Sequence, residues 1–362
     1  MSSNSSSLRA RSTATSTMTS STSTATDRQN YGSTSTGIFS IKPRDESSDT
    51  HSISSSTTTT TKKSAVKKIS SCSRTFTLEE LPAWMHDNPS ILTGYRRETF
   101  SYKKCVESLW FLHNESVNIW THLLGSIICI VGSPIIYFTY IGVLDTIKWT
   151  DVAAFYMFMA GAIICLSMSA SFHCFHCHSE PVSKHWNRCD YVGIVFLIAG
   201  SFYPAIYYGF YCFKTLQIIY TAMITIIGAA VVVVVVRPEF RGHEYRWIRS
   251  GLFLAMGLSS VFPVVHAVVL YGIPLAQKAI ALNYMGCMGA FYVFGTLLYG
   301  SRTPERLFPG KFDHFGSSHQ IFHVCVLLGV LAHFLGVTKA MAFWHDANHS
   351  CAIPIDEMRL AF

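Results

Sequence analysis

The sequence predicts an all-α protein, a seven-transmembrane helix bundle with its N-terminus in the cytosol and its C-terminus outside. Three observations lead to this prediction. Charged residues make up only 14% of the 362 residues, against about 25% in ordinary globular chains. Seven long apolar runs follow one another in the last two thirds of the chain. The loops that connect these runs are alternately poor and rich in basic residues, and this alternation predicts which ends of the helices face the cytosol.

The segment before the first run falls into two parts. Residues 1–75 are dominated by Ser and Thr and cannot bury enough apolar area to offset the entropy of ordering them. We therefore expect a disordered cytosolic tail, and the sequence leaves its phosphorylation open. Over residues 76–118, apolar side chains recur at helical spacing around Cys105 and Leu109, and Thr77 with Glu80 predicts a capping box. Amphipathic helices at the cytosolic membrane surface are expected there.

The transmembrane domain is predicted over residues 119–341, followed by a short extracytosolic tail, 342–362. Each apolar run is long enough to cross a hydrocarbon core of about 30 Å as a helix. The fourth run contains "VVVVVV", which lipid favours as a helix because a helix satisfies its own backbone. No internal repeat, paired broken helix or disulfide framework is evident. The runs cover residues 119–141, 152–173, 190–211, 215–236, 250–271, 279–300 and 319–341.

The loop charges fix the orientation. The loops after the second, fourth and sixth runs hold nine basic residues, whereas the other three loops hold three. The basic-rich side belongs in the cytosol by the positive-inside rule. Because the net charge of +7 is spread over loops and forms no basic face, nucleic acid is not expected as a partner. The nine are Lys184, Arg188, Arg237, Arg241, Arg246, Arg249, Arg302, Arg306 and Lys311, and the three are Lys148, Lys214 and Lys278.

Polar residues within the spans are costly and are candidate functional residues. The orientation places the end of the second span and the starts of the third and seventh spans at the cytosolic face. Three separate helices therefore bring polar residues to the same depth: Ser169 and His173, Asp190, and His319 with His323.

Spacing within these helices indicates a metal site. His319 and His323 are four residues apart, so both imidazoles project from one helix face. With His173 they form the three-histidine set typical of a catalytic Zn²⁺ that keeps one position open for water. Gln320 is not the Glu of an HExxH motif, so the carboxylate that accepts a proton would be Asp190. Ser169 shares a helix face with His173 and either assists the site or bonds its own backbone.

The stretch "SFHCFHCHSE", residues 171–180, suggests a metal tract, but only His173 is expected to face the site. His176 is a weaker candidate, and the residues from Cys177 to Glu180 are expected at headgroup level before Pro181, which is expected to break the helix. Histidines elsewhere are interpreted as packing residues or as lacking an opposed ligand. These are His122, His266 and His333 within spans, and His345 and His349 beyond the last span.

Over about residues 77–341 the sequence resembles the progestin and adipoQ receptor family, whose adiponectin-receptor-type members are related to haemolysin III and include fungal zinc-homeostasis proteins. The resemblance is carried by "LPAWMHDNPSILTGYR", "HNESVNIWTHLLG", "CDYVGI", "PERLFPGKFD" and "SSHQIFHVCVLLGVLAHF", and the Ser/Thr-rich tail suggests a fungal-type member. It implies one Zn²⁺ ion held by His173, His319 and His323, with Asp190 at the metal-bound water and Ser169 beside it. It also implies ceramidase-like hydrolysis of a membrane lipid amide to a fatty acid and a sphingoid base.

Two hypotheses follow. The first is a zinc-dependent intramembrane hydrolase of a ceramide-like lipid, linked to lipid signalling and zinc homeostasis. The alternative is a seven-helix receptor or sensor in which zinc is structural and nothing is turned over. A transporter is less favoured because repeats and paired broken helices are typical of alternating access. An extracellular ligand is not identifiable in the sequence, and either the plasma membrane or the endoplasmic reticulum suits such an integral membrane protein.

Overall fold

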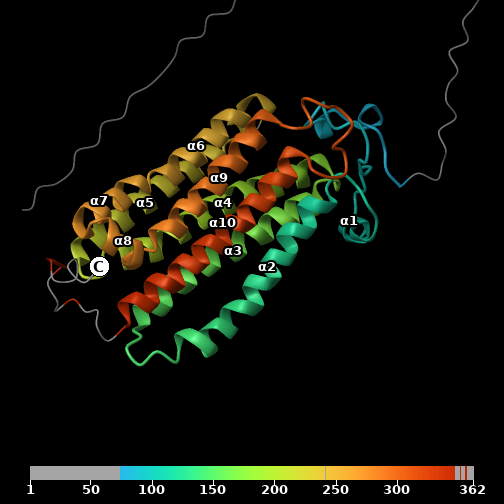
Figure 1. Ribbon diagram of the computed structural model, residues 1–362. Helices are drawn as coiled ribbons and strands as arrows, with labels where there is room; N and C mark the ends of the chain where they lie inside the picture. The colour runs from blue at the N-terminus through green and yellow to red at the C-terminus, as the bar shows by residue number, and fades with distance from the viewer. Residues whose placement is uncertain (1–73, 241, 347–350, 352–354, 357–362) are drawn as a thin grey trace, which may run out of the picture. The chain divides into compact units, whose positions relative to one another are not determined.

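The computed structural model describes residues 74–240, 242–346, 351 and 355–356. The predicted Ser/Thr-rich tail lies outside these residues apart from its last two, and Arg241 and His349 also lie outside them. Within the described residues the chain is helical (Figure 1), and an isolated bridge between Phe76 and Tyr95 takes the place of any strand. The predicted all-α class is confirmed.

Six described stretches are long and apolar enough to cross a membrane, and a seventh is added if the bent pair α8 and α9 counts as one span. This agrees with the predicted seven-helix bundle. The α-helices are α1 (Tyr102–Glu107), α2 (Ser116–Ile136, continued by a π-turn over Tyr137–Ile141), α3 (Trp149–Phe175), α4 (Glu180–Gly209), α5 (Lys214–Val235), α6 (Arg246–Leu258), α7 (Val261–Tyr271), α8 (Ile273–Ala279), α9 (Leu282–Ser301) and α10 (Ser318–Trp344).

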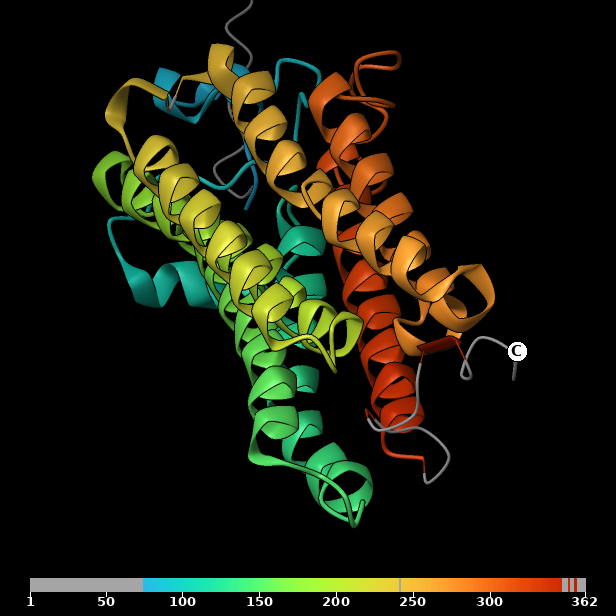
Figure 2. The ribbon, with the colours of Figure 1, turned by 90° about the vertical axis from the view of Figure 1, so that its left-hand side faces the viewer.

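Two helix pairs dominate the bundle. Helix α3 packs along α4, and α10 packs along α9, which Figure 2 shows in orange and red. Glycines permit the closest approach of the first pair: a Cβ atom on Gly161 would lie 2.5 Å from the carbonyl oxygen of Phe196, and one on Gly200 would lie 2.9 Å from that of Met157. Small residues let helix backbones approach in a membrane, and here they bring the residues of α3 against α4.

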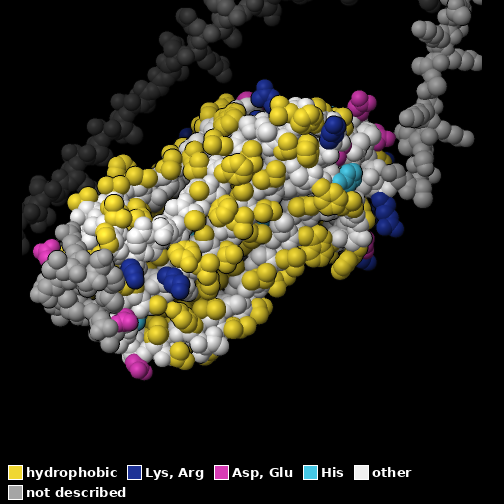
Figure 3. Space-filling model, viewed as in Figure 1, with side chains coloured by type: hydrophobic (Ala, Val, Ile, Leu, Met, Phe, Trp, Pro, Cys, Tyr) yellow, Lys and Arg dark blue, Asp and Glu magenta, His cyan; other side chains and the backbone are white. Residues whose placement is uncertain are grey.

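The surface of the bundle suits lipid. On the face seen in Figure 3, hydrophobic side chains cover the length of the helices, and charged side chains gather towards the two ends. Large apolar side chains such as Ile128, Ile218 and Val269 are exposed along the spans. An exposed apolar surface of this extent is unusual for a soluble protein, and the chain is a multi-pass membrane protein.

The third span differs from the prediction in its start. Helix α4 begins at Glu180, about ten residues before the expected position, and runs for 30 residues. Pro181 does not end a helix but lies in the first turn of α4, where its missing N–H group needs no partner. As a result, Asp190 lies well inside a continuous helix rather than at its first residue.

The fifth predicted span has a short interruption, between the end of α6 at Leu258 and the start of α7 at Val261, and together the two helices are long and apolar enough to form one span. The sixth predicted span, residues 279–300, is matched by α9. The short helix α8, which precedes it in the predicted loop, was not expected. Helices α8 and α9 are bent by 75° at residues 280–281, where Ala281 adopts a left-handed conformation. Helices α7 and α8 lie at the end of the bundle opposite α1 (Figure 1).

The interfacial segment is less helical than predicted. Over residues 76–118 the helical part before α2 is limited to α1 and three 3-10 turns, Leu78–Glu80, Ala83–Met85 and Ser108–Trp110. The predicted pairing of Thr77 and Glu80 is present, because the Glu80 carboxylate accepts a hydrogen bond from the backbone N–H of Thr77 at 2.8 Å. Extended chain connects these turns.

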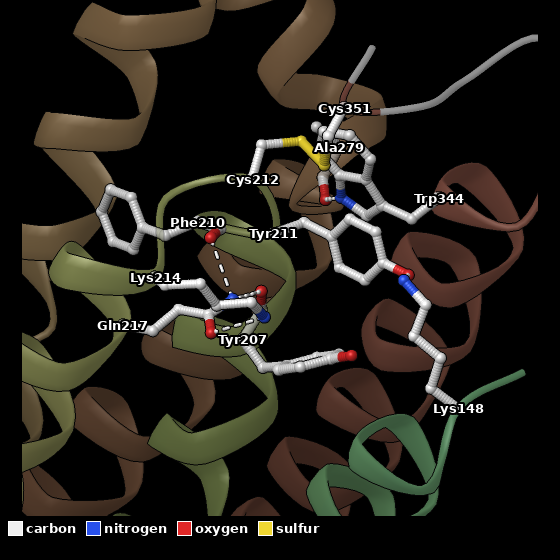
Figure 4. Close-up of a disulfide and its surroundings, with 10 residues drawn as sticks. All are labelled: Lys148, Tyr207, Phe210, Tyr211, Cys212, Lys214, Gln217, Ala279, Trp344 and Cys351. Carbon is white, nitrogen blue, oxygen red and sulfur yellow. Dashed lines mark hydrogen bonds between the residues drawn. A yellow bond between two sulfur atoms is a disulfide. The ribbon is translucent and has the colours of Figure 1, made fainter. Parts of the chain in front are cut away.

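A disulfide joins Cys212, in the loop between α4 and α5, to Cys351 after α10 (Figure 4). This bond was not predicted from the sequence. It joins two residues that are 139 positions apart. Next to it, Tyr211 stacks on Trp344, and the Trp344 indole N–H donates to the carbonyl oxygen of Ala279 at 3.1 Å. This end of the bundle is the one that the loop charges predict to face outside.

Replacing Cys212 or Cys351 by Ser is expected to destabilise the bundle by about 2–4 kcal/mol, because the bond restrains the unfolded chain. The check is the thermal unfolding midpoint of the detergent-solubilised protein with and without a reductant. Reductant should lower the midpoint of the wild type and leave each variant unchanged. Cys287→Ser, which replaces an exposed free cysteine, is the matched control. Equal reductant sensitivity in the wild type and in Cys212→Ser would contradict this assignment.

Candidate metal centre

Three histidines from two helices converge at the end of the bundle where α3 ends and α10 begins. His173 lies in the last turn of α3, and His319 and His323 lie in the first two turns of α10. One ligand atom of each histidine lies within 4.8 Å of the others. In the described part of the chain, this is the one group of three or more His, Cys, Asp or Glu residues close enough to hold a metal ion. His173 and His323 are buried and His319 is half-buried.

The start of α10 is held by buried polar contacts. The carboxylate of Glu305, which is fully buried, accepts hydrogen bonds from the backbone N–H and the hydroxyl of Ser318. Acidic acceptors are favourable at a helix N-terminus because the first N–H groups have no partner within the helix. Gln320 accepts from the backbone N–H of Gly316 at 2.7 Å and donates to the carbonyl oxygen of His314 at 3.0 Å. These hydrogen bonds give Gln320 a structural role at the start of α10, the helix that carries His319 and His323.

Hydrogen bonds leave one nitrogen of each buried imidazole facing the centre. The Nδ1 atom of His173 is 2.7 Å from Oε2 of Glu115, and the Nδ1 atom of His323 is 3.1 Å from the carbonyl oxygen of Asn118. The Nε2 atom of His173 is buried with no hydrogen-bond partner among the described residues. An unpaired buried nitrogen is costly, and a metal ion removes that cost. The donor set therefore fits a metal that prefers imidazole, such as zinc.

Asp190 and Ser169 lie next to the histidines. Both side chains are buried and line the same cavity as the three histidines. The Ser169 hydroxyl and the His173 imidazole both lie near the Asp190 carboxyl group. The structure thus brings together all five residues that the sequence singled out, on α3, α4 and α10.

The cavity beside these residues has a volume of about 1050 Å³, as large as the upper range of small-molecule sites. It extends from the histidines between α4, α6, α7 and α9. Its deeper wall is apolar, with side chains such as Leu197, Leu254 and Val264. A polar end and an apolar body match an amphiphile with one polar group and a long hydrocarbon chain.

Other residues of "SFHCFHCHSE" lie away from the centre. His176 stacks on Phe172 and its Nδ1 atom is 3.3 Å from the Ser183 hydroxyl, so it is not one of the three. Cys177 is buried within the protein, with its sulfur 3.6 Å from that of Cys105. Burial of Cys177 follows from the short connection between α3 and α4, which folds back onto α1.

The remaining histidines divide as follows. His266 is a packing residue hydrogen-bonded to the Tyr220 hydroxyl at 2.9 Å, and His333 packs edge-on against Phe158. The Nε2 atom of His345 lies 3.0 Å from Oδ1 of Asp151. No third possible metal ligand joins this pair among the described residues. His122 is also a packing residue, and the ring on which it stacks is that of His323, with centroids 3.7 Å apart.

Sequence reasoning missed Glu115, which precedes α2 and contacts His173. Burial alone would raise the pKa of its carboxyl group, but the neighbouring His173 imidazole and further hydrogen bonds hold that pKa well below its usual range. Glu115 is therefore a carboxylate at neutral pH. The signal was available in "HNESVN": an acidic residue at the cytosolic start of the first span lies at the same depth as the histidines.

A second missed residue is Arg96, which lies before α1 and caps the C-terminal end of α3. Its guanidinium group is buried and donates hydrogen bonds to the backbone carbonyl oxygens of His173 and Cys174 and to the Ser108 hydroxyl. Cations are favourable at a helix C-terminus, where carbonyl groups lack helical partners. Arg96 thus ties the interfacial segment to the backbone of a candidate ligand.

A family model and individual known proteins both match this chain. The family described as "Haemolysin-III related" matches residues 110–334. The chain is 37% identical over 278 residues to "Adiponectin receptor protein" of Drosophila melanogaster, covering 77% of this chain and 62% of that protein. It is 38% identical over 275 residues to "Progestin and adipoQ receptor-like protein 1" of Caenorhabditis elegans, covering 76% of this chain and 62% of that protein. These two relatives are therefore matched over less than two thirds of their length.

A fungal relative is matched more completely. The chain is 36% identical over 272 residues to "ADIPOR-like receptor IZH2" of Saccharomyces cerevisiae, covering 75% of this chain and 86% of that protein. The family match over residues 110–334 contains the three histidines of the centre.

Proposed function

The chain belongs to the haemolysin-III-related family, among its adiponectin-receptor-like membrane proteins, and on that premise we propose that it is a zinc-dependent hydrolase of membrane lipid amides. The observation that carries the proposal is the position of the three histidines, Asp190 and Ser169 at the polar end of a large apolar cavity. A ceramide-like lipid fits this arrangement, with its amide at the histidines and its acyl chain among the apolar walls. The proposal extends to a role in lipid signalling and zinc homeostasis, at the plasma membrane or the endoplasmic reticulum.

His173, His319 and His323 would hold the Zn²⁺ ion, and the ion would polarise the amide carbonyl and make water more acidic. The residues of the chain transfer the proton and position the lipid. Asp190 accepts the proton of the attacking water at its carboxylate and returns it to the leaving amine nitrogen, so that amide and water give a carboxylic acid and an amine. The Ser169 hydroxyl orients the Asp190 carboxyl group. The apolar walls hold the acyl chain and keep other water away from the amide.

The test is a turnover assay on the purified full-length protein in detergent, with a panel of ceramides of different acyl length. Released fatty acid and sphingoid base are measured with and without a strong zinc chelator, beside the metal content of the same sample. We expect turnover that the chelator removes and added Zn²⁺ restores. Protein that is isolated without metal, or turnover that chelation leaves unchanged, would overturn the proposal.

A second function has support of its own. The relatives from fly, worm and yeast all carry "receptor" in their names, and a metal ion between α3 and α10 would also join two spans. In a receptor or sensor of this kind the zinc would be structural and Asp190 would not be needed for chemistry. The Asp190 variant described in the Discussion separates the two functions.

A further inference from the structure

The first transmembrane helix supplies no ligand to the histidine centre, yet its start surrounds two of the three histidines. Glu115 and Asn118 contact His173 and His323, and His122 stacks on His323. These three residues lie three or four positions apart, so they share one face of the helix. That face is directed at the centre.

The contact from Glu115 has the geometry of a strong hydrogen bond. Its Oε2 atom lies 2.7 Å from Nδ1 of His173, within the range of charge-assisted bonds. The Asn118 side-chain amide donates to the same oxygen at 2.7 Å and so fixes the carboxylate. With Nδ1–H donated to Glu115, the lone pair of His173 is on Nε2, the atom that is buried without a partner in the described residues.

The contact to His323 works in the same direction. Its Nδ1 atom donates to the backbone carbonyl oxygen of Asn118, which leaves Nε2 free to bind. The ring of His122 lies nearly parallel to that of His323, at an angle of 11°, and restricts its rotation. Carboxylate and carbonyl partners of this kind orient metal-bound imidazoles and raise their basicity.

We propose that Glu115 is a positioning residue of the metal centre, which fixes the orientation of His173, with Nε2 towards the ion, from the start of the first transmembrane helix. This inference rests on the proposed metal binding. It assigns to α2 a function that the ligand set alone does not show, because α2 would set the strength with which α3 and α10 hold the ion.

The test compares zinc affinities of the purified full-length protein in detergent. Glu115→Ala removes the acceptor, and Glu115→Gln keeps an acceptor oxygen but loses the charge. Loss of such a partner weakens metal binding about 10–100-fold, so we expect the alanine variant near the upper figure and the glutamine variant nearer the lower. Dissociation constants are measured by competition with a chromophoric zinc chelator. Glu107→Gln is the matched control, because Glu107 is an exposed glutamate on α1 paired only with Lys103 at the surface.

A second measurement separates positioning from a general effect on folding. The protein is loaded with Co²⁺, whose visible absorption bands report ligand geometry, and the unfolding midpoint is measured without metal. We expect altered bands in Glu115→Gln, unaltered bands in Glu107→Gln, and equal metal-free midpoints. Zinc affinities within twofold of the wild type in both Glu115 variants would overturn the inference and leave the proposed function intact. A wild-type protein that binds no zinc would overturn both.

Discussion

Replacing His319 by alanine is expected to remove the bound metal and the hydrolysis that depends on it. His319 is one of only three donors, and two imidazoles leave a first-row ion too weakly held. The loss in zinc affinity should exceed the 10–100-fold that removal of an outer hydrogen-bond partner costs. The measurements are metal content by mass spectrometry after purification and release of fatty acid from ceramide.

His185→Ala is the control for the His319 variant. His185 is exposed on α4, so its removal takes away an imidazole from the same end of the bundle without touching the centre. It should keep full metal content and turnover. If His319→Ala retained zinc at the wild-type level, the three-histidine centre would not be the metal site.

Replacing Asp190 by asparagine is expected to lower turnover by about 10²–10⁴-fold while the zinc content stays unchanged. An amide of the same size cannot accept the proton of the attacking water, and positioned acid–base groups contribute about that factor. Asp190 is not one of the three grouped donors, so the metal should remain. The readouts are kcat for ceramide hydrolysis and metal content of the same preparation.

The result for Asp190 distinguishes the two proposed functions. For a hydrolase, Asp190→Asn binds the lipid but does not cleave it, and Ser169→Ala shows a smaller loss because Ser169 acts through Asp190. For a receptor with structural zinc, the wild type shows no turnover, and Asp190→Asn changes metal retention or stability without loss of signalling. Full hydrolytic activity in Asp190→Asn would exclude the assigned role.

Much of the candidate centre could be predicted because helical geometry is regular. The spacing of His319 and His323 places them on one face whatever surrounds the helix. Loop charges predict the direction in which each span crosses the membrane. Once the direction is known, the position of a residue within its span gives its expected depth. Depth alone brought His173 and Asp190 to the level of the other histidines, and the structure brings all of them to one cavity.

What could not be predicted depends on rotation and on distant pairing. The depth of Glu115 and the helix face that it shares with Asn118 and His122 can be read from the sequence, but its role also requires that this face turn towards α3, and residue spacing does not say which helix a face meets. The bond between Cys212 and Cys351 joins positions 139 residues apart, and eleven irregularly spaced cysteines leave many pairings open. The helix α8 lies in a stretch that holds Pro274 and Lys278 and that the sequence predicts as a loop, and its bend of 75° towards α9 follows at residues 280–281. Each of these features is set by packing between helices.

The buried Arg96 has a consequence for where this domain begins. The family match starts at residue 110, which suggests that a shorter protein beginning there would be complete. Arg96 lies before that boundary and satisfies the last carbonyl groups of α3, including that of His173. Cutting the chain at the family boundary would leave those carbonyl groups without their partner beside the candidate metal centre. The physical unit therefore begins before the family match, in agreement with the resemblance that starts at about residue 77, and the interfacial segment helps to shape the site.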